Sequence, residues 1–209
     1  LSRGLGDVYK RQGDKHVPWV HNVRNTDMVI DIDDEDSQNL LRLFNSEEGH
    51  KYLKEVVHVP DATIEQLSLL GISGIANVLC CIKFAKYYEL TGDDVVATVA
   101  TDSAVMYESR VKELNEQQGN YSLLTAARDF SEHLHGIRTD NMAELTYADR
   151  KRVHNLKYYT WVEQQGKTVE ELNAQWYDHD YWTGIHEQAK DLDKLITEFN
   201  ARTGVAEKI

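Results

Sequence analysis

The stretch that decides the predicted fold reads GISGIANVLCCIKFAK at residues 71–86 and DVVATVATDS at residues 94–103. It predicts a glycine turn, a buried helix over 73–90, a buried strand over 95–101 and a polar turn. A helix that opens on small residues presents unpaired backbone N–H groups. A strand that ends in Thr-Asp-Ser places hydroxyls and a carboxylate at its carboxyl end, where open α/β sheets bind ligands. We therefore expect part of a ligand-binding rim at this point.

The first half of the chain has the pattern of an α/β protein. The Val/Ala/Thr run at 95–101 is apolar on both faces, as strands of a helix-flanked parallel sheet are. Shorter elements precede it, namely an edge strand at Met28–Ile30 and helices at about 35–44, 46–56 and 61–70. The predicted fold class is therefore α/β, with residues 13–118 forming the carboxyl-terminal part of a helix-flanked, mostly parallel sheet.

The second half of the chain, from residue 119 to 209, is predicted to be an all-helical extension. No strand-like run comparable to 95–101 follows Gly119, and apolar residues recur at helical spacing at 123–134, 147–162, 169–176 and 181–199. Thr168 and Glu171 form a capping box, and Gly166 and Gly204 stand where helix C-termini are usually closed. Its many tyrosines and tryptophans, Trp176 and Trp182 among them, predict a surface covered by another domain or a second subunit.

Several short motifs recur along the first half in a fixed order. Gly13 precedes an x-x-x-x-Pro stretch, residues 27–35 read DMVIDIDDE, and residues 47–49 read EEG. GISG follows at 71–74, and DSAVMY follows at 102–107. In order and spacing these motifs resemble the carboxyl-terminal part of the pyridoxal-phosphate enzymes of the cysteine synthase and tryptophan synthase β-subunit type. The segment 52–70 departs from the cysteine synthases as an insertion of about twenty residues, which indicates a distinct subfamily.

The resemblance implies a cofactor, pyridoxal 5'-phosphate, and a set of residues that contact it. In that family a neutral hydroxyl faces the ring nitrogen, and this favours β-elimination and β-replacement over transamination; Ser103 stands at the matching position with Asp102 beside it. Gly13, Gly71, Ser73 and Gly74 match backbone positions that shape the cofactor pocket. Taken without the resemblance, Ser103 is equally well explained as the N-cap of the following helix.

The family's Schiff-base lysine and glycine-rich phosphate loop lie upstream of the motifs found here. Residues 1–12 do not match them, since Asp7–Gln12 resemble the translation of a sequencing adaptor, and we exclude this segment as non-native. No catalytic residue is therefore assigned within the chain. We expect a carboxyl-terminal fragment, inactive by itself, of a longer enzyme that acts on a small serine-type or cysteine-type amino acid.

Two alternative functions stay open. A threonine/serine dehydratase or desulfhydrase would use the same arrangement at the ring nitrogen and differ in the fate of the intermediate. A non-catalytic helical interaction module would rest on the aromatic residues of 119–209 alone. The upstream sequence separates them, because a Schiff-base lysine with a phosphate loop would favour an enzyme.

Composition excludes several other classes of protein. The net charge of -12 argues against a nucleic-acid partner, because neutralising phosphates needs a basic stripe. No apolar run approaches the length of a membrane span, so we expect a cytoplasmic protein, and by the resemblance a homodimer. Cys80 and Cys81 read as small core residues on an apolar helix. His133 and His135 point to different faces of a helix, and we expect no metal site.

Overall fold

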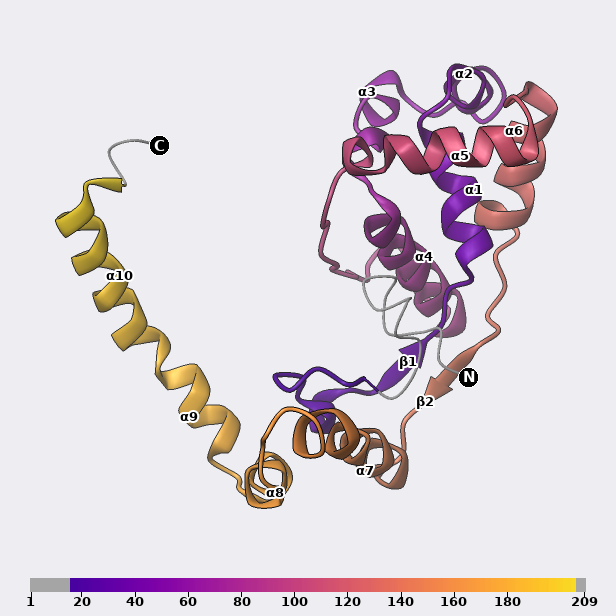
Figure 1. Ribbon diagram of the computed structural model, residues 1–209. Coiled ribbons are helices and arrows are strands. Elements are labelled where there is room, and N and C mark those ends of the chain that lie inside the picture. The colour runs from indigo at the N-terminus through magenta and orange to yellow at the C-terminus, as the bar shows by residue number, and fades with distance from the viewer. Residues whose placement is uncertain (1–15, 206–209) are drawn as a thin grey trace. The chain divides into compact units, whose positions relative to one another are not determined.

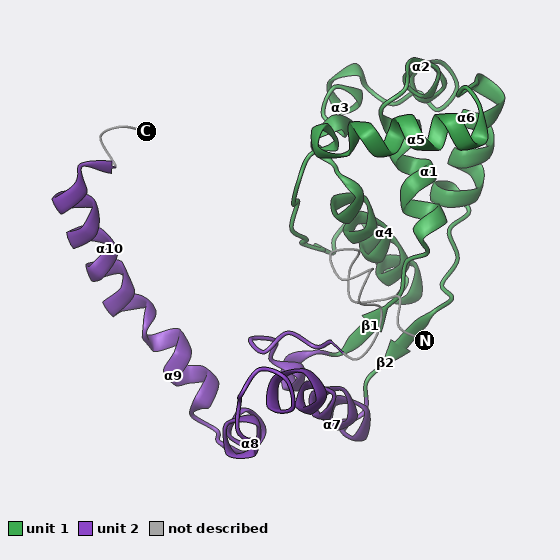
Figure 2. Ribbon diagram, viewed as in Figure 1, with its two compact units in different colours: residues 1–14, 27–145 green, residues 15–26, 146–209 purple. Residues whose placement is uncertain are grey.

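The computed structural model describes residues 16–205 (Figure 1), and the chain divides into two compact units (Figure 2). Within the described range, unit 1 comprises residues 27–145, and unit 2 comprises residues 16–26 and 146–205. Within residues 16–205 the chain thus starts in unit 2, forms unit 1 and then returns to unit 2. Among the described residues no helix is long and apolar enough to cross a membrane.

Unit 1 is built from helices of one to five turns that surround a small core. In chain order its elements are β1 (Met28–Ile30), α1 (Asp34–Phe44), α2 (Glu47–Glu55), α3 (Asp61–Ile64), η3 (Leu67–Leu69), α4 (Ile72–Tyr87), η4 (Ala104–Tyr107), α5 (Glu108–Gln118), α6 (Leu123–Asp129), η5 (Phe130–His135) and β2 (Met142–Glu144). Here η3 and η4 are 3₁₀ turns, and η5 is a π-helical continuation of α6.

The predicted helix-flanked parallel sheet is wrong for this chain. The sheet within residues 16–205 has two strands, β1 and β2, which pair antiparallel with Met28 opposite Glu144 and Ile30 opposite Met142. Residues 95–101 form no strand, and Val95 and Val99 are 92% and 69% exposed. A β-strand is stable only beside another strand that satisfies its N–H and C=O groups, and the described residues place none beside 95–101. An apolar, β-branched run therefore forms no strand and lies exposed.

The core of unit 1 lies between α1, α4 and the α6–η5 helix. Leu40 and Leu43 on α1 are fully buried, and they belong to one cluster with Ile75 and Leu79 of α4. Local sequence explains where α1 begins: the side chain of Asp33 accepts a hydrogen bond from the Glu35 amide, and three acidic residues in the first turn suit the positive end of the helix dipole. The helix expected at about 35–44 is therefore confirmed, with its first residue at Asp34.

Arg42 is a buried cation that joins α1 to the end of α5. Its Nε donates to Asn115 Oδ1 at 3.0 Å, its Nη1 donates to Gln118, and its Nη2 donates to the carbonyl oxygen of Gly119 at 2.8 Å. The guanidinium also lies 4.9 Å from the centroid of the Tyr121 ring. Because the donors have oxygen acceptors, the charge is tolerated in the interior without a carboxylate in direct contact.

Unit 2 consists of short helices held by caps and by tryptophans. Its elements are η2 (Val23–Asn25), α7 (Tyr147–Asn155), η6 (Tyr158–Val162, a π-helical turn), α8 (Val169–Tyr177), α9 (Tyr181–Glu187) and α10 (Ala189–Thr203). The predicted capping box of Thr168 and Glu171 is confirmed, and Thr146 with Asp149 forms a second one. Gly204 closes α10 with a φ of 64°, a left-handed conformation that glycine adopts at little cost.

Lys157 is a buried cation in unit 2 and ties the segment 19–21 to α8. Its ammonium donates to the carbonyl oxygens of Trp19 at 2.9 Å and His21 at 2.7 Å, and to Oε1 of Gln175 at 2.7 Å. The Trp19 and Trp182 rings lie 5.9 and 5.7 Å from the ammonium. Burial disfavours the charged form and lowers the pKa of Lys157 to about 8. The three oxygen acceptors act in the opposite direction, because they match the three N–H donors of the ammonium.

Candidate functional site

The two motifs predicted to form a ligand-binding rim meet at the start of α4. Gly71 is the N-cap of this helix, and its amide donates to the carbonyl oxygen of Asp102 at 2.8 Å. A Cβ at position 71 would lie 2.5 Å from that oxygen and 2.6 Å from Cε2 of Tyr107. Gly71 is therefore required by the close approach of the 102–107 segment.

The remaining residues of the rim lie around this contact. Ser73 and Gly74, in the first turn of α4, are buried. A Cβ at Gly74 would meet Cδ2 of Leu70 at 3.3 Å, a tight but local contact. One turn further, Nδ2 of Asn77 donates to the Val99 carbonyl at 2.9 Å, which holds the unpaired 95–101 segment against the helix. Gly13 lies outside the described residues.

Ser103 occupies a position at which its hydroxyl has no capping role. It is half-buried and stands at the N-cap of η4, yet its side chain makes no capping hydrogen bond; its backbone carbonyl accepts from the Met106 amide at 3.2 Å. Asp102 beside it is exposed. The interpretation of Ser103 as a helix cap is thus not supported by the geometry, although the position itself is that of an N-cap.

The rim combines three features with chemical consequences. No side chain caps α4, a helix of 16 residues, so its first amides and its dipole favour a negatively charged or electron-rich group. Ser103 presents a hydroxyl that both donates and accepts. Asp102 supplies a carboxylate at the exposed side.

A second polar site, which the sequence did not predict, lies between α1 and η5. His133 is buried; its Nδ1 lies 2.7 Å from Oδ1 of Asp36, and its Nε2 lies 3.0 Å from Nδ2 of Asn39. With Nδ1–H donating to the carboxylate, Nε2 accepts from the Asn39 amide, and this tautomer follows from the partners. Burial acts to lower the pKa of His133, but the hydrogen bond and charge of Asp36 prevail and raise it.

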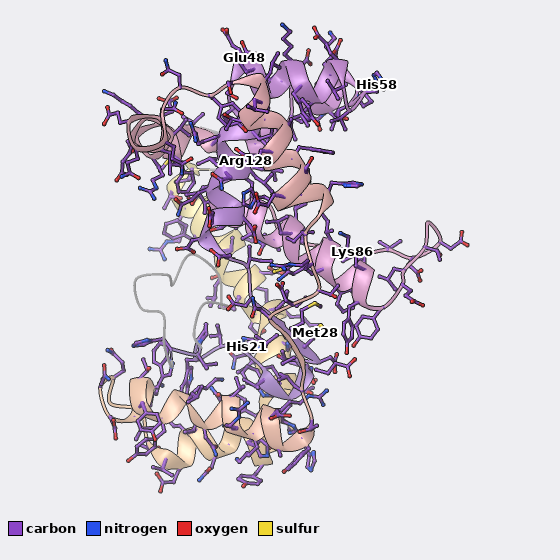
Figure 3. The ribbon with its side chains drawn as sticks, turned by 90° about the vertical axis from the view of Figure 1, so that its right-hand side faces the viewer. His21, Met28, Glu48, His58, Lys86 and Arg128 are labelled. Atoms are coloured by element: carbon purple, nitrogen blue, oxygen red, sulfur yellow. The ribbon has the colours of Figure 1, made fainter. Side chains whose placement is uncertain are left out.

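This histidine borders a polar cavity of about 470 Å³. Lys83 of α4 lines the same cavity: its ammonium donates to the carbonyl oxygens of Asp31 and Asp140 at 3.0 and 2.8 Å and forms an ion pair with the Asp140 carboxylate. Lys86, labelled on α4 in Figure 3, donates to the carbonyl oxygens of His135 and Ile137. Both lysines therefore bind backbone oxygens and hold the chain that leads from η5 to β2.

Sequence reasoning missed this site because its members are far apart in the chain. Asp36 and Asn39 are three residues apart on α1 and so share a face, which is the one local signal. His133 completes the site from a helix almost a hundred residues later, and its Nε2 faces the Asn39 amide. Within residues 16–205, no group of three or more His, Cys, Asp or Glu side chains is placed to hold a metal ion.

The cysteines of α4 have no site of their own. Burial raises the pKa of Cys80 to about 11, so this thiol stays protonated at neutral pH and is a poor nucleophile. Both cysteines are reduced and partly buried.

Comparison of the chain with models of protein families, with curated proteins and with solved structures finds no match. The resemblance of residues 13–107 to the cysteine synthases therefore stays a prediction.

Proposed function

We propose that this chain is part of a cytoplasmic, pyridoxal-phosphate-dependent enzyme that replaces or eliminates the β-substituent of a serine-type or cysteine-type amino acid. Ser103, Asp102, Gly71, Ser73 and Gly74 belong to its cofactor site. The observation that carries the proposal is the half-buried Ser103 hydroxyl, which caps no helix and stands beside the uncapped start of α4.

The residues at the rim fit the ring-nitrogen side of the cofactor. When bound, pyridoxal phosphate supplies an electron sink for the substrate's Cα. Ser103 would face the ring nitrogen with a neutral hydroxyl, which leaves the ring less strongly electron-withdrawing than a carboxylate would. The Gly71–Asp102 hydrogen bond holds Ser103 at the helix start, and the lack of a side chain at Gly71 permits that approach.

A stability measurement on this chain tests the observation that carries the proposal. Ser122 caps α6 by accepting from the Thr125 amide at 3.2 Å, so Ser122→Ala should cost about 1 kcal/mol of unfolding free energy. Ser103→Ala should cost less than about 0.5 kcal/mol, because no capping bond is lost. Equal losses in the two variants, measured by urea denaturation, would assign Ser103 to structure.

The activity is tested in the complete gene product that carries this sequence. With added pyridoxal phosphate, the purified protein should absorb near the visible edge and consume O-substituted serine or cysteine substrates. Ser103→Asp should keep the fold and reduce turnover about fivefold or more, because a charge replaces a neutral hydrogen bond worth roughly 1 kcal/mol. A colourless protein that binds no cofactor contradicts the proposal. Release of ammonia and a keto acid without a replacement product would identify elimination as the reaction, and would favour the dehydratase or desulfhydrase alternative over a synthase.

A further inference from the structure

Helix α10 carries an apolar stripe that nothing in the described part of the chain covers. Leu192, Leu195, Ile196 and Phe199 recur at i, i+3, i+4 and i+7, and each is between 52% and 61% exposed. No residue of α10 is buried. An isolated helix of this length is marginal in water, and a stripe at this spacing is the pattern with which a helix enters a hydrophobic groove.

The charges of α10 are arranged around this stripe. By helical spacing, Asp193 borders it on one side and Glu198 borders it on the other, while Lys190 and Lys194 lie on the opposite face. Lys194 is paired with Asp191 at 3.0 Å. Apart from Arg202 near the last turn, the stripe is edged by carboxylates. Its complement is therefore an apolar surface with basic residues at its edge.

Unit 2 contains such a surface on α7, η6 and α8. A groove of about 830 Å³ has walls that include Tyr147, Leu156, Tyr159, Val169 and Leu172. Several of these side chains, Tyr147, Tyr159 and Val169, are exposed although they are largely apolar. The groove thus offers uncovered apolar area of the kind that marks an interaction site.

The edge of this groove is basic. Lys151 lines it, and its ammonium lies 4.6 and 4.4 Å from the ring centroids of Trp176 and Tyr177. Arg152 also lines it; its side chain is largely exposed and forms a long ion pair with the Asp149 carboxylate, at 3.5 Å. Two cations at the edge match the acidic borders of the α10 stripe, whereas two α10 helices packed together would bring their carboxylates near one another.

We propose that α10 of one copy of this chain docks its apolar stripe into the α7–η6–α8 groove of a second copy. In a two-fold symmetric dimer the contact occurs twice, because each copy offers one α10 and one groove. Phe199 and Leu195 enter the apolar part, and Asp193 and Glu198 meet Lys151 and Arg152 at the edge. The inference does not depend on the proposed activity, since its test measures association alone.

Sedimentation of the 209-residue chain over a range of concentrations tests the proposal. The unmodified chain should be dimeric. Phe199→Asp, in the stripe, and Val169→Asp, in the groove, should each weaken dimerisation about tenfold or more, because each buries a charge in an apolar contact. Val169 is the first residue of α8, where an acidic residue suits the helix dipole, so the second variant keeps its fold. Thr197→Asp adds the same charge to α10 away from the stripe and should leave the dimer unchanged.

Mixing the two variants distinguishes this contact from others. Phe199→Asp retains an intact groove and Val169→Asp retains an intact α10, so together they should form a heterodimer through one intact contact. If the chain is monomeric at every concentration, α10 does not dock into the groove of a second copy. Continued dimerisation of Val169→Asp with loss in Phe199→Asp would mean that α10 pairs with α10. Either result overturns the proposal.

Discussion

Replacement of Lys157 by methionine should destabilise unit 2 by about 2 kcal/mol. Methionine keeps most of the side chain's apolar stem, so the packing changes little and the main effect is loss of the ammonium. The carbonyl oxygen of Trp19 keeps a partner, because Nε2 of Gln175 also donates to it at 3.0 Å. The carbonyl oxygen of His21 and Oε1 of Gln175 lose the Lys157 donor, and each unsatisfied buried group costs about 1–3 kcal/mol. Relief of the burial cost that lowers the pKa of Lys157 to about 8 offsets part of this loss.

Tryptophan fluorescence reports this change selectively. All four tryptophans of the chain, Trp19, Trp161, Trp176 and Trp182, belong to unit 2, so their emission during a urea titration follows the unfolding of that unit. For a unit of this size, 2 kcal/mol corresponds to a fall in Tm of roughly 10 °C. Lys54→Met is the matched control: Lys54 forms an exposed ion pair with Asp61 in unit 1, so this variant should leave the urea midpoint reported by the tryptophans of unit 2 unchanged.

A second measurement separates the charge of Lys157 from its packing. Burial and then the charge of Lys157 lower the pKa of His21, so Lys157→Met should raise the pKa of His21 toward its ordinary value in an NMR titration. An unchanged urea midpoint together with an unchanged His21 titration would refute the view that the ammonium of Lys157 organises unit 2.

Three further predictions concern single residues. Gly71→Ala should destabilise unit 1 by about 1–3 kcal/mol in urea denaturation, because the new Cβ would lie 2.5 Å from the Asp102 carbonyl oxygen. In the control variant Gly92→Ala the new Cβ meets no atom within 4 Å, so this change should be nearly neutral. Equal effects of the two substitutions would contradict the close approach at Gly71. The pKa of His133 is raised, so its contribution to the stability of unit 1 should be complete below its ordinary pKa of 6.5 and be lost as the pH rises through the folded pKa. Asp36→Asn should lower the pKa of His133 in an NMR titration, and an unchanged pKa would argue against the His133–Asp36 hydrogen bond. Burial lowers the pKa of His154 to about 4, so the unfolded chain binds a proton that the folded unit does not, and unit 2 should lose stability as the pH falls from 6.5 to about 4. His154→Gln should reduce this dependence of stability on pH, measured in acid titrations followed by tryptophan fluorescence. An unaltered dependence would exclude His154 as its source.

The sequence alone determined the features that depend on a few neighbouring residues. The strand at Met28–Ile30 forms, α1 begins beside Asp33, and Thr168 with Glu171 caps α8, because capping and hydrophobic periodicity act within one or two turns. The same local signals did not predict where helices are interrupted. The helix expected at 61–70 is α3 followed by η3, and the helix expected at 181–199 divides at Gln188 into α9 and α10.

The tertiary structure decided which segments found partners. The run at 95–101 has the composition of a buried strand, but a strand needs the N–H and C=O groups of a neighbour, and none lies beside it among residues 16–205. Gly71 and Asp102 were expected at one rim and do meet, through a backbone hydrogen bond that no side-chain pattern specifies. His133 with Asp36, and Lys157 with the 19–21 carbonyls, could not be predicted, because each buried polar group is satisfied by residues about a hundred or more positions away, whose proximity only the packed helices create.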